Sequence, residues 1–314
     1  MKSQDIQVSV CVVTYNQEKY IADCLDSLLS QKTNFKFEII VGEDYSKDGT
    51  RAIVQKYAEQ YPDIIVPLLY EKNVGPVENL KRVYQKAKGK YIAHMDGDDL
   101  ALPNKLQKQF DILEMNPDCS ICVHNMNAID GNSQKMNRAF SLFDEKKYSL
   151  LDMYLINPFF IHSSKMFVNK IDEYIGKLNE NALDIEVHIE QAKQGDIYFI
   201  GECLGVYRQF VGVTYEGKLI NPIIPVRIQD VYHKFPSQKF SVDEINKVKK
   251  KYAYILLQYA NHYTLRGDFI IAKKFVKQSL IASKSIYSLL FILIFINPYF
   301  LKVILKLYEN QDGR

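Results

Sequence analysis

The first hundred residues alternate between two hydrophobic patterns. The apolar run at 8–13, rich in Val, predicts a strand that is buried on both faces. Further strands are predicted at 35–41, 64–70 and 91–95. Between them, apolar residues recur at helical spacing over 17–30, 48–60 and 77–88. Repeated strand–helix–strand units predict a mostly parallel sheet flanked by helices, with ligands beyond the carboxyl ends of the strands.

The pattern changes twice in the second half. Residues 131–158 are polar and irregular, and a helix at 183–194 with strands at 197–200 and 204–208 follows. From about residue 221 strands disappear, and two amphipathic helices, 242–265 and 269–283, are separated by Arg266-Gly267-Asp268. We therefore expect an α/β domain at 1–220 and a helical C-terminal region at 221–314, made of a helical hairpin plus an apolar tail.

The tail at 286–306 has three open interpretations. Its apolar run, 286–296, is shorter than the roughly 20 residues that span a bilayer. With Lys302 and Lys306, the segment suits the interface of a membrane. The alternatives are packing on the α/β domain and a contact within a homodimer.

The composition argues against nucleic-acid binding and against a zinc site. The chain has 314 residues, with 40 Lys and Arg against 37 Asp and Glu, and this balance gives no case for nucleic-acid binding. Cys119 and Cys122 have CxxC spacing, but no second pair completes a zinc site, so the five cysteines are expected to be reduced thiols. The polar first residues lack the apolar core of a signal peptide. We expect a cytoplasmic protein.

The strongest candidate chemistry is Asp96-Gly97-Asp98-Asp99, directly after the fourth predicted strand. Clustered carboxylates repel one another unless a cation compensates, and oxygen ligands with substrate phosphates suit Mg²⁺ or Mn²⁺. Gly97 permits close approach of a diphosphate to the backbone. The structural alternative is an exposed acidic turn before a helix.

Two further clusters follow strands one and two. Thr14-Tyr15-Asn16 offers an aromatic face for a pyrimidine base, or a helix start capped by Asn16. In the loop 42–50, Asp44 is placed to bind a base or ribose, whereas Asp48 suits a helix cap or turn.

Together these clusters resemble the family 2 glycosyltransferases of the GT-A fold, a Rossmann-like mostly parallel sheet. The resemblance covers about residues 7–215 and rests on the segments 8–16, 42–50, 73–75 and 91–99. It implies an enzyme of the hexosyltransferase kind, with a nucleoside-diphosphate-sugar donor (UDP favoured), Mn²⁺ or Mg²⁺, and a glycan or lipid-linked acceptor in surface-polysaccharide synthesis. Such an enzyme would be cytoplasmic or peripheral on the inner face of the cytoplasmic membrane.

The resemblance also implies roles for residues. Tyr15 and Asp44, with Thr14, correspond to contacts of the base, and Asn73, with Lys72 beside it, lies near the donor. Asp96 corresponds to a ribose or phosphate contact that adjoins the metal, and Asp98 to the direct metal ligand, with Gly97 between them.

The catalytic base is expected in the second half. In relatives that invert the anomeric centre, one carboxylate deprotonates the acceptor hydroxyl, and an acidic motif precedes a segment ending in Tyr-Arg. Here Asp184 is the first choice and Glu186 the second, with Tyr207-Arg208 closing the segment. The structural alternative is that Asp184 caps a helix. Where many relatives have a His after Tyr-Arg, this chain has Phe210, and His162 is noted on the acceptor side.

Two other functions stay open. A sugar-nucleotide pyrophosphorylase would show a Gly-rich loop at the first strand, and 8–16 contains no Gly. A non-catalytic nucleotide-sugar-binding or scaffold protein would not require both Asp98 and Asp184. A Rossmann dehydrogenase is disfavoured because no GxGxxG follows the first strand.

Overall fold

The computed structural model of the protein describes residues 5–139, 143–156, 159–209, 211 and 221–283. The chain divides into two compact units, Met1–Asn221 and Pro222–Arg314. Phe210 and the tail at 286–306 lie outside the described residues.

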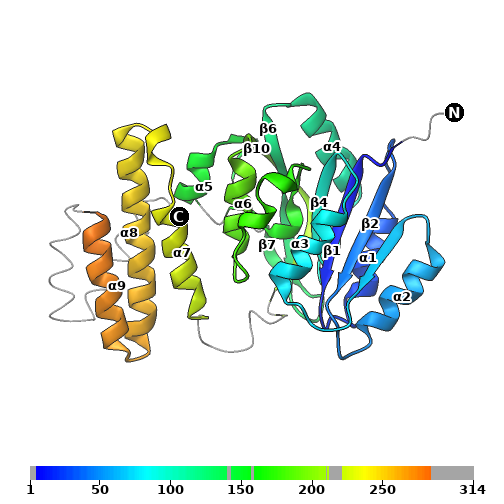
Figure 1. Cartoon of the computed structure of the whole chain (residues 1–314), viewed down its shortest axis with the longest axis horizontal. Coiled ribbons are helices and arrows are strands. Elements are labelled where there is room, and N and C mark those ends of the chain that lie inside the picture. The colour runs from blue at the N-terminus through cyan, green and yellow to red at the C-terminus, as the bar shows by residue number, and fades with distance from the viewer. Residues whose placement is uncertain (1–4, 140–142, 157–158, 210, 212–220, 284–314) are drawn as a thin grey trace. The chain divides into compact units, whose positions relative to one another are not determined.

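A ten-stranded sheet forms the first unit (Figure 1). Its main path runs β3-β2-β1-β4-β9-β6-β10-β5, with β7 beside β6 and β8 beside β10. β1, β2, β3 and β4 are parallel, as are β6 and β10, whereas β9 is antiparallel to both β4 and β6. The strands are β1 Val8–Thr14, β2 Phe37–Glu43, β3 Ile65–Leu69, β4 Tyr91–Asp96, β5 Leu100–Ala101, β6 Cys119–Ile129, β7 Lys135–Ala139, β8 Lys146–Tyr148, β9 Met166–Val168 and β10 Asp196–Arg208.

Side chains along a strand alternate between the two faces of the sheet, so both faces carry apolar residues, and helices pack against them. Val8, Val10 and Val12 of β1 join one apolar cluster with residues of α1, α2 and α4. On the other face, the Cys11 thiol donates to the carbonyl of Val83 in α3. The helices of this unit are α1 Ile21–Leu29, α2 Thr50–Gln60, α3 Pro76–Lys86, α4 Lys105–Met115, α5 Leu150–Ile156 and α6 Asp184–Ala192.

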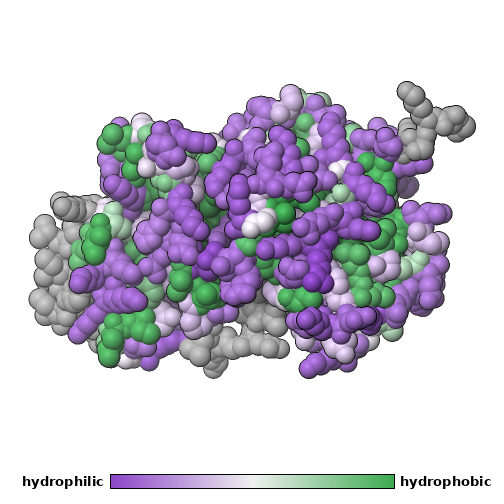
Figure 2. Space-filling view, in the orientation of Figure 1, coloured by the Kyte–Doolittle hydropathy of each residue, from purple (hydrophilic) through white to green (hydrophobic). Residues whose placement is uncertain are grey.

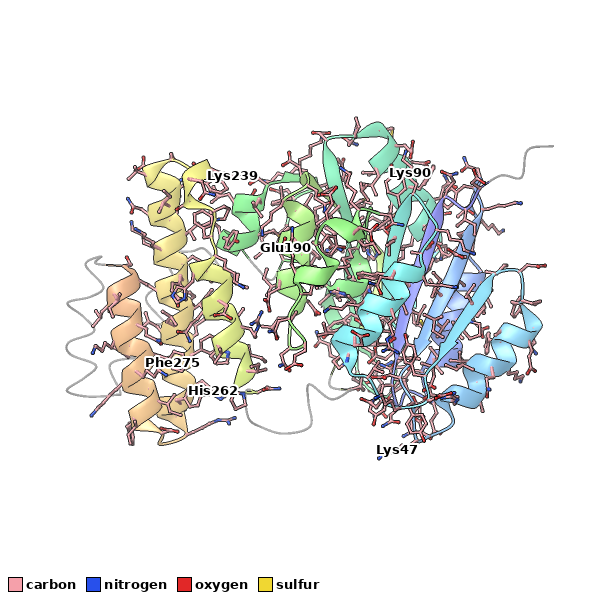
Figure 3. All side chains as sticks on the ribbon, in the orientation of Figure 1. Lys47, Lys90, Glu190, Lys239, His262 and Phe275 are labelled. Carbon is pink, nitrogen blue, oxygen red and sulfur yellow. The ribbon has the colours of Figure 1, made fainter. Side chains whose placement is uncertain are left out.

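Strand register aligns the ends of β1, β2 and β4. Thr14 pairs with Glu43, and Val13 pairs with Asp96. β9 runs antiparallel between β4 and β6, so β6 and β10 end at the same edge. Lys47 lies beyond the end of β2 and Lys90 precedes β4, and the two mark opposite edges of the sheet (Figure 3). The predicted clusters therefore share the edge marked by Lys47.

The predicted α/β class is confirmed, and so is the helical character of the C-terminal region, but several elements differ from prediction. β9 was not predicted because three residues are too short to show a period. The predicted strands at 197–200 and 204–208 form one strand, β10, whose pairing with β6 is irregular between Ile200 and Cys203. The segment expected to be irregular contains β7, β8 and α5.

The second unit is helical where the structure describes it. α7 Ile223–His233, α8 Val242–Leu265 and α9 Phe269–Ala282 are its helices, and the pattern had predicted the last two. Leu256, Ala260 and Phe275 are buried in the cluster between α8 and α9. In this view most of the described surface is hydrophilic, with apolar patches (Figure 2). Among the described helices, none combines the length and apolarity needed to span a membrane.

Candidate active site

The loops after β1 and β2 are tied together by hydrogen bonds. Asn16, at φ 52°, accepts from Lys47 N–H through its Oδ1 (2.9 Å) and donates its N–H to Ser46 Oγ (2.9 Å). Asp48 Oδ1 accepts from Thr50 N–H (3.0 Å) at the start of α2. Asp48 thus has the structural contact expected of it, whereas α1 begins only at Ile21 and is not capped by Asn16.

Asp44 organises the loop before α3. Its Oδ1 accepts from Val74 N–H (2.6 Å) and its Oδ2 from Gly75 N–H (3.0 Å), while Asn73 Nδ2 donates to its carbonyl (3.1 Å). Burial raises the pKa of Asp44, and these backbone hydrogen bonds oppose that rise. The structure therefore brings Asp44 and Asn73 together. In this state, backbone groups of the loop occupy part of the hydrogen-bonding capacity of Asp44.

Asp96 ends β4 and is held on two sides. His94 Nε2 lies 3.2 Å from Asp96 Oδ1, and the Ser163 hydroxyl donates to Oδ2 (3.1 Å) while accepting from Asp96 N–H (3.0 Å). Burial alone would raise the pKa of Asp96, but the hydrogen bonds from His94 and Ser163 lower it. Asp96 is therefore poised to be negatively charged.

At Asp98 and Asp99 the surroundings disfavour the charged form of the carboxyl group. Burial, followed by repulsion from Asp96, raises the pKa of Asp98 to about 6. Burial and both neighbouring carboxylates raise that of Asp99 well above its usual value. Asp99 Oδ2 is buried and has no hydrogen-bond partner in the structure. Among the described residues, no Lys or Arg forms an ion pair with these three carboxylates.

Gly97 is required by packing within the protein. Its N–H donates to the carbonyl of Val13 (3.0 Å). A Cβ at this position would lie 2.6 Å from Gln17 Oε1 and 2.9 Å from Thr14 Oγ1, and Thr14 Oγ1 itself donates to Gln17 (2.8 Å). Thr14 and Gly97 therefore meet at the edge of the sheet. Tyr15, the next residue after β1, is half-buried.

Arg208, the last residue of β10, fastens the acidic turn to the other half of the sheet. Its N–H donates to Asp99 Oδ1 (2.9 Å) and its Nε to the carbonyl of Asp98 (3.1 Å). Its Nη1 donates to Ser133 Oγ (2.9 Å), and the guanidinium lies 4.3 Å from the ring centroid of Tyr20. From the sequence, Arg208 was evident only as the end of the segment that closes with Tyr207-Arg208. Its buried side chain orders the turn that carries Asp98.

Asp184 is the first residue of α6 but does not cap it. Glu186 accepts from Leu183 N–H (3.0 Å) and so satisfies that end of the helix. The Asp184 carboxylate lies 3.5 Å from His162 Nδ1, and its side chain is 70% exposed. Desolvation by neighbouring protein atoms raises the pKa of Asp184, and the negative charge of Asp96 raises it further. The positive charge of Lys165 lowers it in part. Asp184 is therefore an accessible carboxylate within the field of Asp96.

Two histidine rings connect the acidic turn to Asp184. The rings of His94 and His162 meet edge to face, with centroids 3.8 Å apart. His94 contacts Asp96, and His162 faces Asp184. Of these two histidines, only His162 was evident as a candidate from the sequence. The available signal for His94 was its place two residues before Asp96 on a buried strand, which puts both side chains on one face.

The described residues include no group of three or more His, Cys, Asp and Glu arranged to hold a metal ion. Asp96 and Asp98 can offer carboxylate oxygens, which Mg²⁺ and Mn²⁺ accept. Two carboxylates suit a cation that takes its remaining ligands from substrate phosphates and water.

The sequence places this chain in a known family. A family model described as "Glycosyl transferase family 2" matches residues 9–176, more than half of the chain. The chain belongs to glycosyltransferase family 2. The expected family and fold class are thereby confirmed.

Curated relatives align with part of the chain. An uncharacterized protein of Mycobacterium tuberculosis is 31% identical over 203 residues, 64% of this chain and 58% of that protein. A Bacillus subtilis protein whose name assigns it to teichuronic acid biosynthesis as a glycosyltransferase, TuaG, is 36% identical over 106 residues, 34% of this chain and 41% of that protein. The chain thus spans less than two thirds of the length of these relatives.

Solved structures share the fold. TarS of S. aureus, residues 1–349 in complex with UDP-GlcNAc, has a TM-score of 0.56 and 17% identity, over 88% of this chain and 93% of that chain. The mannosyltransferase PcManGT of Pyrobaculum calidifontis, in complex with GDP-Man and Mn²⁺, has a TM-score of 0.54 and 17% identity, over 98% of this chain and 85% of that chain.

We expect Asp98→Asn to raise the thermal unfolding midpoint of the metal-free protein by a few degrees at about pH 8, but not at about pH 4. The folded-state pKa of Asp98, about 6, exceeds the ordinary 3.8, so stability falls as pH rises through this window and the variant removes the loss. Scanning calorimetry in chelator measures the midpoint. An equal gain in Asp63→Asn, an exposed carboxylate between α2 and β3, would contradict this assignment.

Proposed function

We propose that the protein is a metal-dependent inverting glycosyltransferase. It moves a sugar from a nucleoside-diphosphate-sugar, with UDP as the favoured nucleotide, to a glycan or lipid-linked acceptor in surface-polysaccharide synthesis. The observation that carries this proposal is the set of clustered carboxylates at the end of β4, which no Lys or Arg of the described residues neutralises by an ion pair. A divalent cation with the donor diphosphate would compensate that charge.

The donor would bind along the edge where β1, β2 and β4 end. Tyr15 and Asp44 are assigned to the base with Thr14, Asn73 to the donor, and Asp96 to the ribose or a phosphate. Asp98, with Asp96, would hold Mn²⁺ or Mg²⁺, and Gly97 keeps the turn close to Thr14. A cation at this place supplies Lewis-acid stabilisation of the departing diphosphate.

Asp184 is assigned as the general base. Its exposed carboxylate accepts the proton of the acceptor hydroxyl while the hydroxyl oxygen attacks the anomeric carbon of the donor sugar. A raised pKa brings this carboxylate closer to the operating pH, which favours proton transfer. Glu186, the second choice from sequence, is engaged with Leu183 N–H, which supports Asp184.

Two alternatives are weaker. Membership of family 2 disfavours a sugar-nucleotide pyrophosphorylase. A binding or scaffold protein on the same fold would keep the donor site but would not need an accessible Asp184, and the variants below separate it from an enzyme.

We expect UDP to raise the unfolding midpoint in Mn²⁺ but not in chelator, because Asp96 and Asp98 would hold a cation that compensates the charge of the diphosphate. Asp98→Ala should abolish this rise, and Asp63→Ala should retain it. Thermal melts with UDP and GDP, with and without the metal, measure the effect. Metal-independent stabilisation, or a full rise in Asp98→Ala, would contradict the metal assignment.

Asp184→Asn should bind UDP and Mn²⁺ as tightly as the parent chain and lose transfer by about 100-fold or more, since a positioned base contributes roughly 10² to 10⁴ in rate. Release of nucleotide from a panel of UDP-GlcNAc, UDP-glucose, UDP-galactose and GDP-Man gives the rate, and titration gives the affinity. Normal turnover by Asp184→Asn rules out this residue as the base. Metal-dependent binding without turnover in the parent chain for any donor and acceptor would favour the scaffold alternative.

We further propose peripheral contact with the cytoplasmic leaflet through residues 286–306, supported by the apolar run beside Lys302 and Lys306. The full chain should sediment with liposomes containing anionic lipid, and a chain ending at residue 284 should stay in the supernatant. A homodimer that forms only in the full chain, without liposome binding, would assign the segment to a dimer contact instead.

A further inference from the structure

Three buried histidines lie between Asp96 and Asp184. His94 is in β4, His162 opens the short helix η1 (His162–Ser164), and His188 is in α6. Their exposed fractions are 1%, 6% and 4%. Burial lowers the pKa of His162 and His188, so at neutral pH each of these two rings carries a single N–H. The position of the N–H on each ring then decides which neighbouring atoms the ring can donate a hydrogen bond to.

The contacts of His94 assign its proton. Its Nε2 lies 3.2 Å from Asp96 Oδ1, and its Nδ1 lies 3.0 Å from the Tyr84 hydroxyl. A carboxylate only accepts, so Nε2 carries the proton and Nδ1 accepts from Tyr84. His94 therefore donates its N–H to Asp96.

The contacts of His162 likewise indicate where its proton lies. Its Nδ1 faces two atoms, His188 Nε2 at 3.0 Å and Asp184 Oδ1 at 3.5 Å. If His188 donated, the bare lone pair of His162 Nδ1 would face a carboxylate and repel it. With the proton on His162 Nδ1, His188 Nε2 accepts the hydrogen bond at 3.0 Å, and the Asp184 carboxylate at 3.5 Å faces an N–H instead of a lone pair. Nε2 of His162 then has no proton, which agrees with its being buried without a hydrogen-bond partner in the structure.

Asp184 needs such a partner because its own helix does not orient its side chain. Glu186, not Asp184, accepts from the N–H of Leu183 at the start of α6. The Asp184 side chain is 70% exposed, and an exposed carboxylate rotates among several conformers. A base that must meet an acceptor hydroxyl loses rate when its geometry is loose.

We propose that His162 is a positioning residue that orients Asp184 through Nδ1–H and leaves the second carboxylate oxygen to take the acceptor proton. The role rests on the proposed function, in which Asp184 is the base. Since the His162 ring packs against His94, the residue that holds Asp96, the two carboxylates are held by rings in direct contact. We expect the 3.5 Å separation to shorten to a hydrogen bond in the complex with substrates.

The first test compares two substitutions of His162. His162→Phe keeps a ring but removes the donor, and His162→Asn keeps an N–H near the place of Nδ1. We expect kcat for nucleotide release, measured with the donor that the panel identifies, to fall about 10- to 100-fold in His162→Phe and to recover within about threefold of the parent in His162→Asn. The donor KM should change less than about twofold in both.

The matched control is His124→Asn, which alters a buried histidine of β6 whose Nδ1–H donates to the carbonyl of Asn125, away from this cluster. Its kcat per folded molecule should equal that of the parent, even if its unfolding midpoint falls. Equal loss of kcat in His162→Phe and His162→Asn would mean that the ring only packs, and the proposal would be wrong.

Asp184→Asn separates this inference from the proposed function. If Asp184→Asn is inactive and His162→Phe is fully active, Asp184 remains the base and His162 does not position it. If Asp184→Asn is active, the proposed mechanism itself fails. In the double variant, His162→Phe should add no further loss to Asp184→Asn, because the two residues act as one unit.

A spectroscopic test needs no substrate. With ring nitrogens labelled in the full chain, the six histidines can be assigned by single substitutions, and their two-bond couplings distinguish Nδ1–H from Nε2–H. We expect Nδ1–H for His162 and Nε2–H for His94 at neutral pH. An Nε2–H form of His162 would overturn the proposal, whatever the activity of the variants.

Discussion

Repulsion among carboxylates at the end of β4 is the constraint that the site is built around. Asp96, Asp98 and Asp99 lie within four residues, and burial raises the pKa of the last two. Repulsion among these carboxylates disfavours the ordered conformation of the turn. The surrounding residues therefore hold this turn in one conformation against the repulsion among its carboxylates. In the proposed function, a cation and a diphosphate would relieve that repulsion.

Neutral donors, rather than cations, perform most of this work. Ser163 and His94 hold Asp96, and the N–H of Arg208 holds Asp99. The guanidinium of Arg208 donates to carbonyl and hydroxyl oxygens and lies over Tyr20. Because these groups leave the carboxylates without a tight ion pair, the negative charge stays available to a ligand.

Much of this arrangement was predictable. A valine-rich run predicted β1, and helical spacing predicted α8 to the residue, because burial of an element leaves a pattern in its sequence. The acidic turn was predicted at the end of β4, since the ends of parallel strands meet at one edge. β9 was missed because three residues carry no period. The structural alternative for Asn16, a helix cap, is not found, because its side chain instead holds the loop after β2.

Sequence by itself determined the family, the α/β pattern and the residues Asp96, Asp98 and Asp184 as candidates, because these depend on local order along the chain. Only the tertiary structure decided how they are supported. His94 and His162 are 68 positions apart in the numbering, yet their rings are in contact. Such a contact depends on the pairing of β4 with β9 and on the packing of α6, which no local pattern encodes.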